Sequence, residues 1–154
     1  MVDFSKSRTI DEFHVGERFK TASFTLDEAS LLSFSQMYDP QPLHTDKQYA
    51  ATGPFGELIA SGIQTLAISI RLFVDLGLFN GTCLAGPAID DILFYEPVKI
   101  GDTLHCQVTV IEARRSKKDS NRGVLRTHYQ VFNQNQVEVL SHKITTIISA
   151  NTNK

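Results

Sequence analysis

The second half of the chain alternates between apolar and polar positions with the period of two that is typical of half-buried β-strands. Residues 103–110 show the pattern most clearly, because their apolar and polar side chains fall on opposite faces of an extended chain. Turn-rich segments join these stretches at hairpin distance. Four strands are predicted: residues 89–95, 103–110, 124–132 and 137–149.

The first half instead shows helical spacing. The longest predicted helix runs from Gly62 to about Leu76, and its apolar side chains extend nearly all round it, which is typical of a buried helix. A shorter helix is predicted to begin after Thr25, whose side chain would cap it together with Glu28. Pro40 is expected to end this helix, because proline lacks an N–H and disfavours a helical conformation at the preceding residue.

Two short segments complete the first half. Residues 8–25 are predicted as irregular or short extended structure with a turn at Gly16, and residues 46–51 as a short helix. Helices followed by antiparallel strands predict an α+β fold in which one buried helix packs against a sheet. A chain of 154 residues fits one domain, residues 1–154.

Charge and hydropathy exclude several classes of partner. The formal net charge is -2 and no uninterrupted run of four Lys or Arg occurs, so neither nucleic acid nor a membrane is expected as a partner. The densest basic stretch, residues 114–118, is interpreted as a solvated hairpin tip, with a phosphate site for a nucleotide or CoA as the alternative. Residues 58–70 form the longest uncharged apolar stretch, shorter than the roughly 20 residues that span a bilayer. Without an apolar signal segment, the sequence predicts a soluble, cytoplasmic protein.

Cysteine and histidine positions give no sign of a metal site or of a disulfide framework. Cys83 and Cys106 belong to no Cys-x-x-Cys pair or Cys/His cluster. The histidines other than His44 lack metal-ligand spacing. No metal and no redox cofactor are therefore expected.

The segment with the strongest candidates for catalytic residues is Asp39-Pro40-Gln41-Pro42-Leu43-His44. It resembles the Asp-x-Asn-Pro-x-His signature of the MaoC-like (R)-specific enoyl-CoA hydratase/dehydratase family. Further short motifs follow in the order of the family: Thr45-Asp46, Tyr49-Ala50, Phe55-Gly56, Ala60-Ser61-Gly62, Pro97-Val98, Gly101-Asp102-Thr103-Leu104 and Asn133-Gln134. Each motif is weak alone, but the ordered set covers nearly the whole chain.

The resemblance implies a hotdog fold, in which a long central helix is wrapped by a curved antiparallel β-sheet. It implies subunits that form a homodimer or a dimer of dimers. It also implies hydration of a trans-2-enoyl-CoA to an (R)-3-hydroxyacyl-CoA, or the reverse dehydration, in fatty acid metabolism. An acyl-CoA thioester is then the substrate, no cofactor is required, and Asp39 and His44 are the catalytic pair.

The residues themselves are compatible with this chemistry without establishing it. Hydration removes one proton from water and delivers one to the α-carbon of the enoyl group. Histidine suits proton exchange because its ordinary pKa lies near 6.5, and a carboxylate can share the water or carry the proton. Five residues can span about 17 Å, so a kink must bring Asp39 to His44. Taken alone, Asp39 is more typical of a turn residue and His44 of a loop histidine.

The second chemical requirement is stabilisation of the enolate-like oxygen of the thioester. Ser61 and Gly62 open the long predicted helix, where free backbone N–H groups and the positive end of the helix dipole converge. The resemblance implies that the Gly62 N–H binds this oxygen, and glycine lets the thioester approach the backbone. Ser61 belongs to the same substrate-binding prediction. It is expected as a helix N-cap rather than a nucleophile, because no Gly-x-Ser-x-Gly surrounds it.

Two positions depart from the family pattern. Gln41 stands where many members have Asn, and Ser61 where many hydratases have His, so the acyl group is not assigned. Two other functions stay open at this point. One is a hotdog acyl-CoA thioesterase, which the Asp-x-x-x-x-His pattern disfavours, and the other is a non-catalytic acyl-CoA-binding module.

Overall fold

An antiparallel sheet and one long helix make up most of the molecule. The computed structural model describes residues 1–151. The main path of the sheet has the order β1-β4-β5-β6-β3, and β2 pairs with the start of β4. The strands are β1 (Arg18–Lys20), β2 (Phe24–Thr25), β3 (Cys83–Phe94), β4 (Thr103–Arg115), β5 (Arg122–Phe132) and β6 (Glu138–Ser149).

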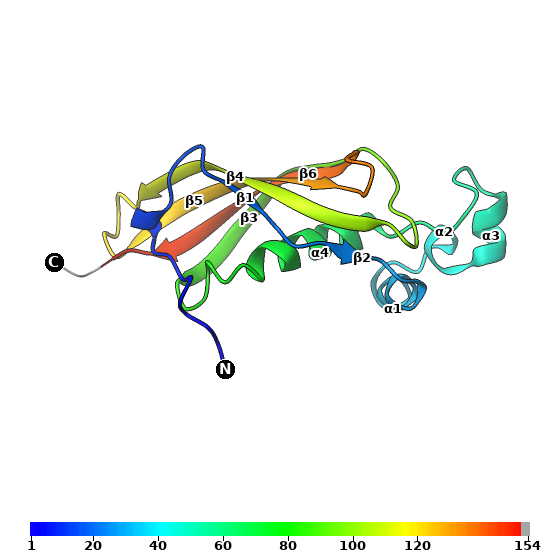
Figure 1. Cartoon of the computed structure of the whole chain (residues 1–154), viewed down its shortest axis with the longest axis horizontal. Helices are drawn as coiled ribbons and strands as arrows, with labels where there is room; N and C mark the ends of the chain where they lie inside the picture. The colour runs from blue at the N-terminus through cyan, green and yellow to red at the C-terminus, as the bar shows by residue number, and fades with distance from the viewer. Residues whose placement is uncertain (152–154) are drawn as a thin grey trace.

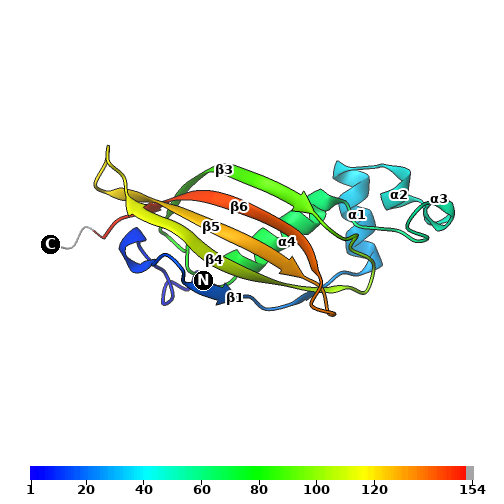
Figure 2. The ribbon, with the colours of Figure 1, turned by 90° about the horizontal axis from the view of Figure 1, so that it is seen from above.

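The helices lie on one face and at the two ends of this sheet, with the 3-10 helix at the end opposite to three of the α-helices (Figure 1). They are the 3-10 helix η1 (Ile10–Glu12) and the α-helices α1 (Glu28–Tyr38), α2 (Pro42–Thr45), α3 (Lys47–Thr52) and α4 (Gly62–Val74). Helix α4 runs beneath the curved sheet, whereas α1, α2 and α3 gather beyond one end of it (Figures 1 and 2). This arrangement confirms the predicted long helix packed against an antiparallel sheet.

The core lies between α4 and the sheet. The alternation predicted for β4 and β5 is confirmed, since Leu104, Cys106, Val108 and Val110 are buried on β4, and Leu125, Thr127, Tyr129 and Val131 on β5. Phe73 of α4 contacts the ring of Tyr129 edge-on, at a centroid distance of 5.4 Å. Burial of this apolar surface is the main favourable contribution to folding.

The predicted cap of the shorter helix, α1, was wrong. Asp27, not Thr25, is the N-cap of α1, and its side chain accepts a hydrogen bond from the Ser30 N–H at 2.7 Å. Thr25 lies in β2, where its hydroxyl pairs with that of Thr103. The pairing of β2 with β4 commits Thr25 to an extended strand, so the next acceptor along the chain caps the helix.

The composition of helix α4 predicted burial on all sides, and this prediction was wrong. Its inner face is buried, but Ile63 and Val74 are 55% and 42% exposed, and Ala67 is exposed between them. These positions recur at helical spacing and form one apolar stripe on the outer side. A second apolar surface in contact with this stripe would account for the pattern.

Two further elements differ from their predictions. Strand β3 begins at Cys83 rather than near Ile89, and it contains Pro87. Proline is tolerated there because β3 is the edge strand, paired only with β6. Helix α2 was not predicted, because the prolines around it indicated a non-helical segment. Pro42 instead occupies the first turn of α2, where a missing N–H has no cost.

Candidate active site

The turn between α1 and α2 brings Asp39 and His44 together. Asp39 is the C-cap of α1 and its N–H donates to the Ser35 carbonyl. The chain then reverses at Pro40, with the Gln41 N–H donating to the Asp39 carbonyl at 2.8 Å and the His44 N–H to the Gln41 carbonyl at 2.9 Å. As a result, His44 Nε2 lies 3.4 Å from Asp39 Oδ2. This is the kink that the spacing alone required.

The His44 ring is buried and held in one orientation. Its Nδ1 lies 2.7 Å from the backbone carbonyl of Ile59, and the residue is 6% exposed. A carbonyl oxygen can only accept, so Nδ1 carries the proton and donates it. In the neutral ring the lone pair is therefore on Nε2, the nitrogen that faces Asp39.

Both oxygens of the Asp39 carboxyl group accept a hydrogen bond. Gln41 Nε2 donates to Oδ1 and the Ser61 hydroxyl donates to Oδ2, each at 2.7 Å. The hydrogen bonds from Gln41 and Ser61 hold the pKa of Asp39 below its usual 3.8, and the nearby His44 ring lowers it further. Asp39 is therefore an ionised acceptor near neutral pH.

The start of α4 forms the opposite wall. Ser61 is the N-cap of α4, as predicted, and its hydroxyl oxygen accepts from the Ile63 N–H at 3.3 Å. The Gly62 N–H has no hydrogen-bond acceptor among residues 1–151. The Phe94 ring packs so closely on Gly62 that an added Cβ would lie 2.5 Å from its Cε1 atom. Because this atom is the far end of a half-exposed side chain, a larger residue at position 62 would require the Phe94 ring to move.

A cavity of about 350 Å³ opens beside these groups. Its walls combine His44 and Gly62 with mostly apolar side chains from the end of β3, the segment before α4 and β6. The remaining lining residues are Phe55, Ile59, Ala60, Thr65, Phe94, Tyr95, Glu96, Pro97, Val98 and Val139. A second hollow, between α1 and α4, is more apolar and contains neither Asp39 nor His44. The cavity with His44 is the candidate active site because, of these two, it alone is lined by His44, whose Nε2 lies 3.4 Å from the Asp39 carboxylate.

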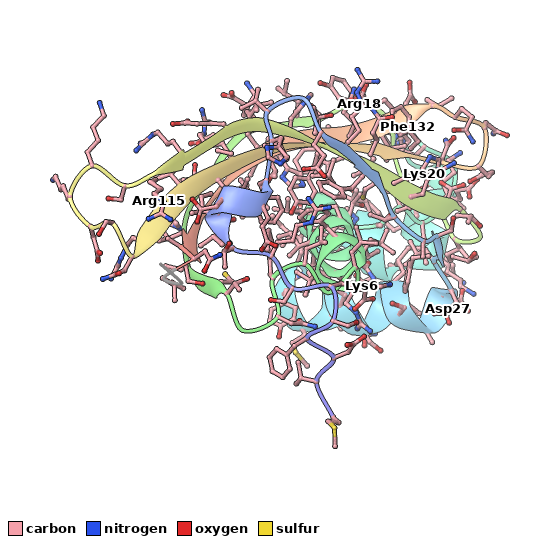
Figure 3. All side chains as sticks on the ribbon, turned by 60° about the vertical axis from the view of Figure 1, so that its left-hand side comes forward. Lys6, Arg18, Lys20, Asp27, Arg115 and Phe132 are labelled. Carbon is pink, nitrogen blue, oxygen red and sulfur yellow. The ribbon has the colours of Figure 1, made fainter. Side chains whose placement is uncertain are left out.

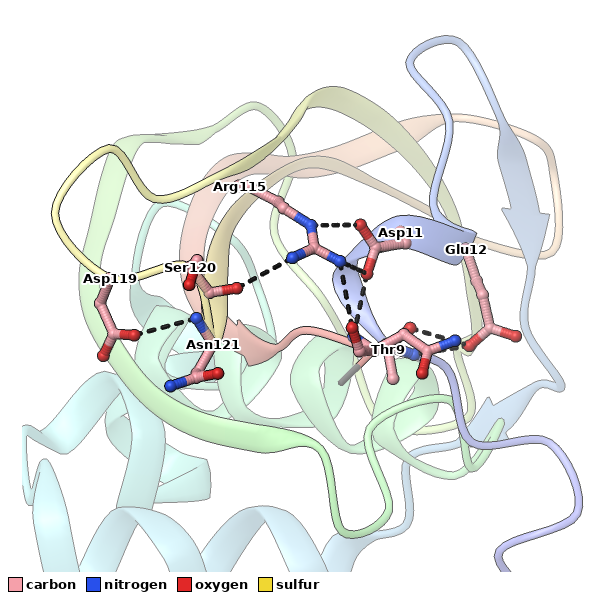
Figure 4. Close-up of polar contacts among 8 residues, drawn as sticks. Thr9, Asp11, Glu12, Arg115, Asp119, Ser120 and Asn121 are labelled. Carbon is pink, nitrogen blue, oxygen red and sulfur yellow. Dashed lines mark hydrogen bonds and ion pairs between the residues drawn. The ribbon is translucent and has the colours of Figure 1, made fainter. Parts of the chain in front are cut away.

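The basic stretch 114–118 lies away from this cavity. Arg115 ends β4 and Phe132 pairs with the start of that strand, so the two labels mark opposite ends of the sheet (Figure 3). Arg115 forms a bidentate ion pair with Asp11 and also donates to the Ser120 carbonyl (Figure 4). These contacts fasten the hairpin to η1, which supports the structural interpretation over a phosphate site.

Sequence reasoning missed three contributors to the site. The Ile59 carbonyl fixes the tautomer of His44, but a backbone group leaves no mark in a sequence. The Gln41 side chain was noted only as a departure from the family pattern, although its position two residues after Asp39 places it within reach. Phe94 was predicted only as part of a strand.

Among residues 1–151, no group of three or more His, Cys, Asp or Glu side chains lies close enough to hold a metal ion, and no helix in that range is long and apolar enough to cross a membrane.

The family model described as MaoC like domain matches residues 11–135. The chain belongs to this family. It is 34% identical over 139 residues to the uncharacterized protein YdeM of Bacillus subtilis, which covers 90% of this chain and 97% of that protein. The predicted family membership is thereby confirmed.

Solved structures of the family share the fold. A MaoC-like dehydratase from Rhodospirillum rubrum superposes with a TM-score of 0.86 at 29% identity, covering 95% of this chain and 99% of that one. The unliganded R-hydratase PhaJ1 of Pseudomonas aeruginosa superposes with a TM-score of 0.73 at 28% identity, covering 93% and 86%. The fold is therefore the predicted α+β hotdog fold. The family includes R-hydratases, but the catalytic roles of Asp39, His44, Ser61 and Gly62 remain predictions.

Proposed function

We propose that this MaoC-like chain is an enoyl-CoA hydratase that interconverts trans-2-enoyl-CoA and (R)-3-hydroxyacyl-CoA in fatty acid metabolism. The observation that carries the proposal is the 3.4 Å approach of His44 Nε2 to Asp39 Oδ2 at the edge of the cavity. Two hydrogen-bond acceptors face each other there, one neutral and one anionic. Such a pair is suited to hold a water molecule and to take a proton from it.

A water molecule fits the pair geometrically. Its two hydrogens can point at Nε2 and Oδ2, each from the usual donor–acceptor distance of about 2.8 Å. Loss of one proton from this water to the pair leaves its oxygen free to bond the β-carbon of the enoyl group. Return of a proton from the pair to the α-carbon completes the addition, and the reverse order of steps is the dehydration. General acid–base assistance of this kind typically contributes about 10²–10⁴-fold.

The thioester carbonyl must be stabilised while the α-carbon is electron-rich. The Gly62 N–H, which has no acceptor among residues 1–151, lies at the start of the 13-residue helix α4 and is suited to this role, because the helix dipole adds to its positive potential. His44 and Gly62 line the same cavity, so one substrate can meet both. The mostly apolar walls suit the acyl group, and the CoA moiety would serve as the handle at the cavity mouth.

Three functions are separated by one set of assays on the purified protein. Hydration is followed by loss of the absorbance of the conjugated enoyl thioester in crotonyl-CoA and longer homologues. We expect this loss without release of free thiol. Thiol release would indicate the acyl-CoA thioesterase, and saturable binding of acyl-CoA without turnover would indicate the binding module.

We further propose that the protein is a homodimer formed through β3 and the outer stripe of α4. Strand β3 lies at the sheet edge and is largely exposed along its length. Its exposed apolar side chains are Leu84, Ile89, Ile92, Leu93 and Phe94. Long apolar edge strands are rarely left open in a soluble protein, because they pair with other chains. A second copy is the occupant with matching chemistry, since the same strand and stripe recur on it.

The dimer is tested by placing charges on this surface. A variant with Ile89→Lys and Val74→Glu is expected to shift from dimer to monomer in sedimentation analysis. Val15→Lys is the matched control, because Val15 is 67% exposed but lies outside β3 and α4. A wild-type protein that sediments as a monomer at all concentrations would contradict the proposed dimer. Since Phe94 of β3 lines the cavity, the monomeric variant is also expected to lose activity.

A further inference from the structure

The Asp39 carboxylate lies between two helix ends of opposite polarity. It is the C-cap of α1, where the partial negative charge of the helix terminus disfavours an anion. Its Oδ2 atom accepts a hydrogen bond from the hydroxyl of Ser61, the N-cap residue at the start of α4. The Ser61 side chain thus links the positive end of α4 to the carboxylate. This contact offsets the unfavourable position at the end of α1.

The second oxygen is held from the turn itself. Gln41 Nε2 donates to Oδ1 across two residues, and the amide group remains exposed at the surface. Ser61 in contrast is fully buried, and its hydroxyl has a single proton, which is used on Asp39. Its oxygen meanwhile accepts from Ile63. The only proton of the Ser61 hydroxyl is therefore donated to Asp39 and not to a substrate.

We propose that Ser61 and Gln41 are positioning residues that hold both oxygens of Asp39 as hydrogen-bond acceptors, so that Asp39 orients the water while His44 alone exchanges the proton. The inference rests on the proposed hydratase function. In this division, water bonds to the β-carbon through its oxygen and gives one proton to His44 Nε2. The imidazolium then returns this proton to the α-carbon and becomes neutral again. The carboxylate keeps its charge throughout, which stabilises the imidazolium formed between the two steps.

The charged and titratable groups around Asp39 are compatible with this division. His44 on α2 is the partner at 3.4 Å. Glu28, at the opposite end of α1 from Asp39, is ion-paired with Lys47 on α3. The segment that follows β3 contributes Tyr95, whose hydroxyl pairs with that of Ser141, and Glu96. The donors to Asp39 itself are thus Ser61 and Gln41, and both are neutral.

A double-mutant cycle at neutral pH tests whether Ser61 acts through Asp39. Ser61→Ala is expected to lower the kcat of hydration at least about tenfold, the loss typical of one hydrogen bond to a charged group, with little change in KM. In an Asp39→Asn background the same substitution is expected to have almost no further effect. Ser61→Thr, which keeps the hydroxyl, is expected to restore most of kcat. Equal losses in both backgrounds, or a rise in KM alone, would overturn the proposal.

Ser35→Ala is the matched control. Ser35 is buried on α1 next to the site, its hydroxyl has no partner among residues 1–151, and only its backbone carbonyl contacts Asp39. The change removes the same atom from a buried serine without touching the carboxylate. It is therefore expected to leave kcat unchanged, and a loss equal to that of Ser61→Ala would mean that the site responds to any nearby serine deletion.

A measurement without turnover keeps this inference separable from the proposed function. The 13C signal of the Asp39 carboxyl group, assigned with Asp39→Asn, is followed by NMR from neutral pH down to about pH 4. The wild-type signal is expected to remain that of a carboxylate, whereas the signals of Ser61→Ala and Gln41→Ala are expected to titrate at a higher pH, because each variant lacks a hydrogen bond that lowers the pKa of Asp39. Identical titrations in all three proteins would overturn the proposal. A wild-type protein that fails to hydrate any enoyl-CoA but shows these shifts would refute the proposed function and leave the two hydrogen bonds established.

Discussion

Alanine in place of His44 is expected to lower the kcat for enoyl-CoA hydration at least about 10²-fold, with the fold intact. The hydrogen bond from His44 Nδ1–H to the Ile59 carbonyl fixes the orientation of the ring. The lone pair of Nε2 is therefore left free to accept a proton at the cavity. Without it no base accepts the proton of the water held by Asp39. The measurement is the rate of loss of the enoyl absorbance under saturating substrate, together with a circular dichroism spectrum.

Asp39→Asn is the companion substitution, and it is also expected to lose at least about 10²-fold. An amide of nearly the same shape can present an N–H where the carboxylate presents a lone pair, so the water loses one acceptor. His14→Ala is the control, because His14 is exposed and lies outside the cavity. Turnover close to that of the wild type in either His44→Ala or Asp39→Asn would sink the assignment of the pair.

The fate of Asp39 and His44 shows how far the sequence alone reaches into the site. Their identity and order were visible, but their distance depends on a reversal at Pro40 that uses only backbone hydrogen bonds. The resemblance to a family supplied what spacing does not contain. Ser61 shows the opposite case, because its role as the N-cap of α4 was predicted from its position, while its bond to Asp39 joins residues 22 apart. Long-range polar contacts of this kind leave no local pattern.

The elements of the fold follow the same division. Strands β4 and β5 were predicted because one face of each is buried, so burial imposes a period of two on the side chains. Strand β3 is largely exposed and its first half carries no such constraint, so its start was missed. The capping residue of α1 was misplaced by two positions, since pairing of β2 with β4 decides where the helix can begin. Local pattern therefore fails where a tertiary contact chooses between two adequate local solutions.

His142 is the group expected to couple the stability of the fold to pH. It is fully buried and stacks on the Tyr129 ring at a centroid distance of 4.4 Å. The Ser69 hydroxyl donates to the Leu66 carbonyl at 2.6 Å, so the His142 Nε2–H must donate to Ser69 Oγ, 2.8 Å away. Nδ1 then holds the lone pair and has no partner among residues 1–151. Protonation would add a charge and an N–H with no acceptor, which the native structure resists.

The free energy of unfolding is therefore expected to fall by about 3 kcal/mol between pH 6.5 and pH 4, because a pKa unit is worth about 1.4 kcal/mol. Burial, together with the nearby His128, lowers the pKa of His142 from 6.5 to about 4. In this window the unfolded chain binds the proton and the native chain does not, so stability is full above pH 6.5 and is lost as the pH falls towards 4.

Urea titrations at a series of pH values measure the loss of stability. His142→Phe keeps a ring against Tyr129 but does not titrate, so its urea midpoint is expected to change far less over the same range. Carboxyl groups with lowered pKa, such as Asp11 and Asp39, lose their contribution from about pH 5 downward and mostly below pH 4, so they account for only a small part of the loss in this window. A wild-type midpoint that stays constant down to pH 4 would show that a proton acceptor reaches Nδ1 in the native protein.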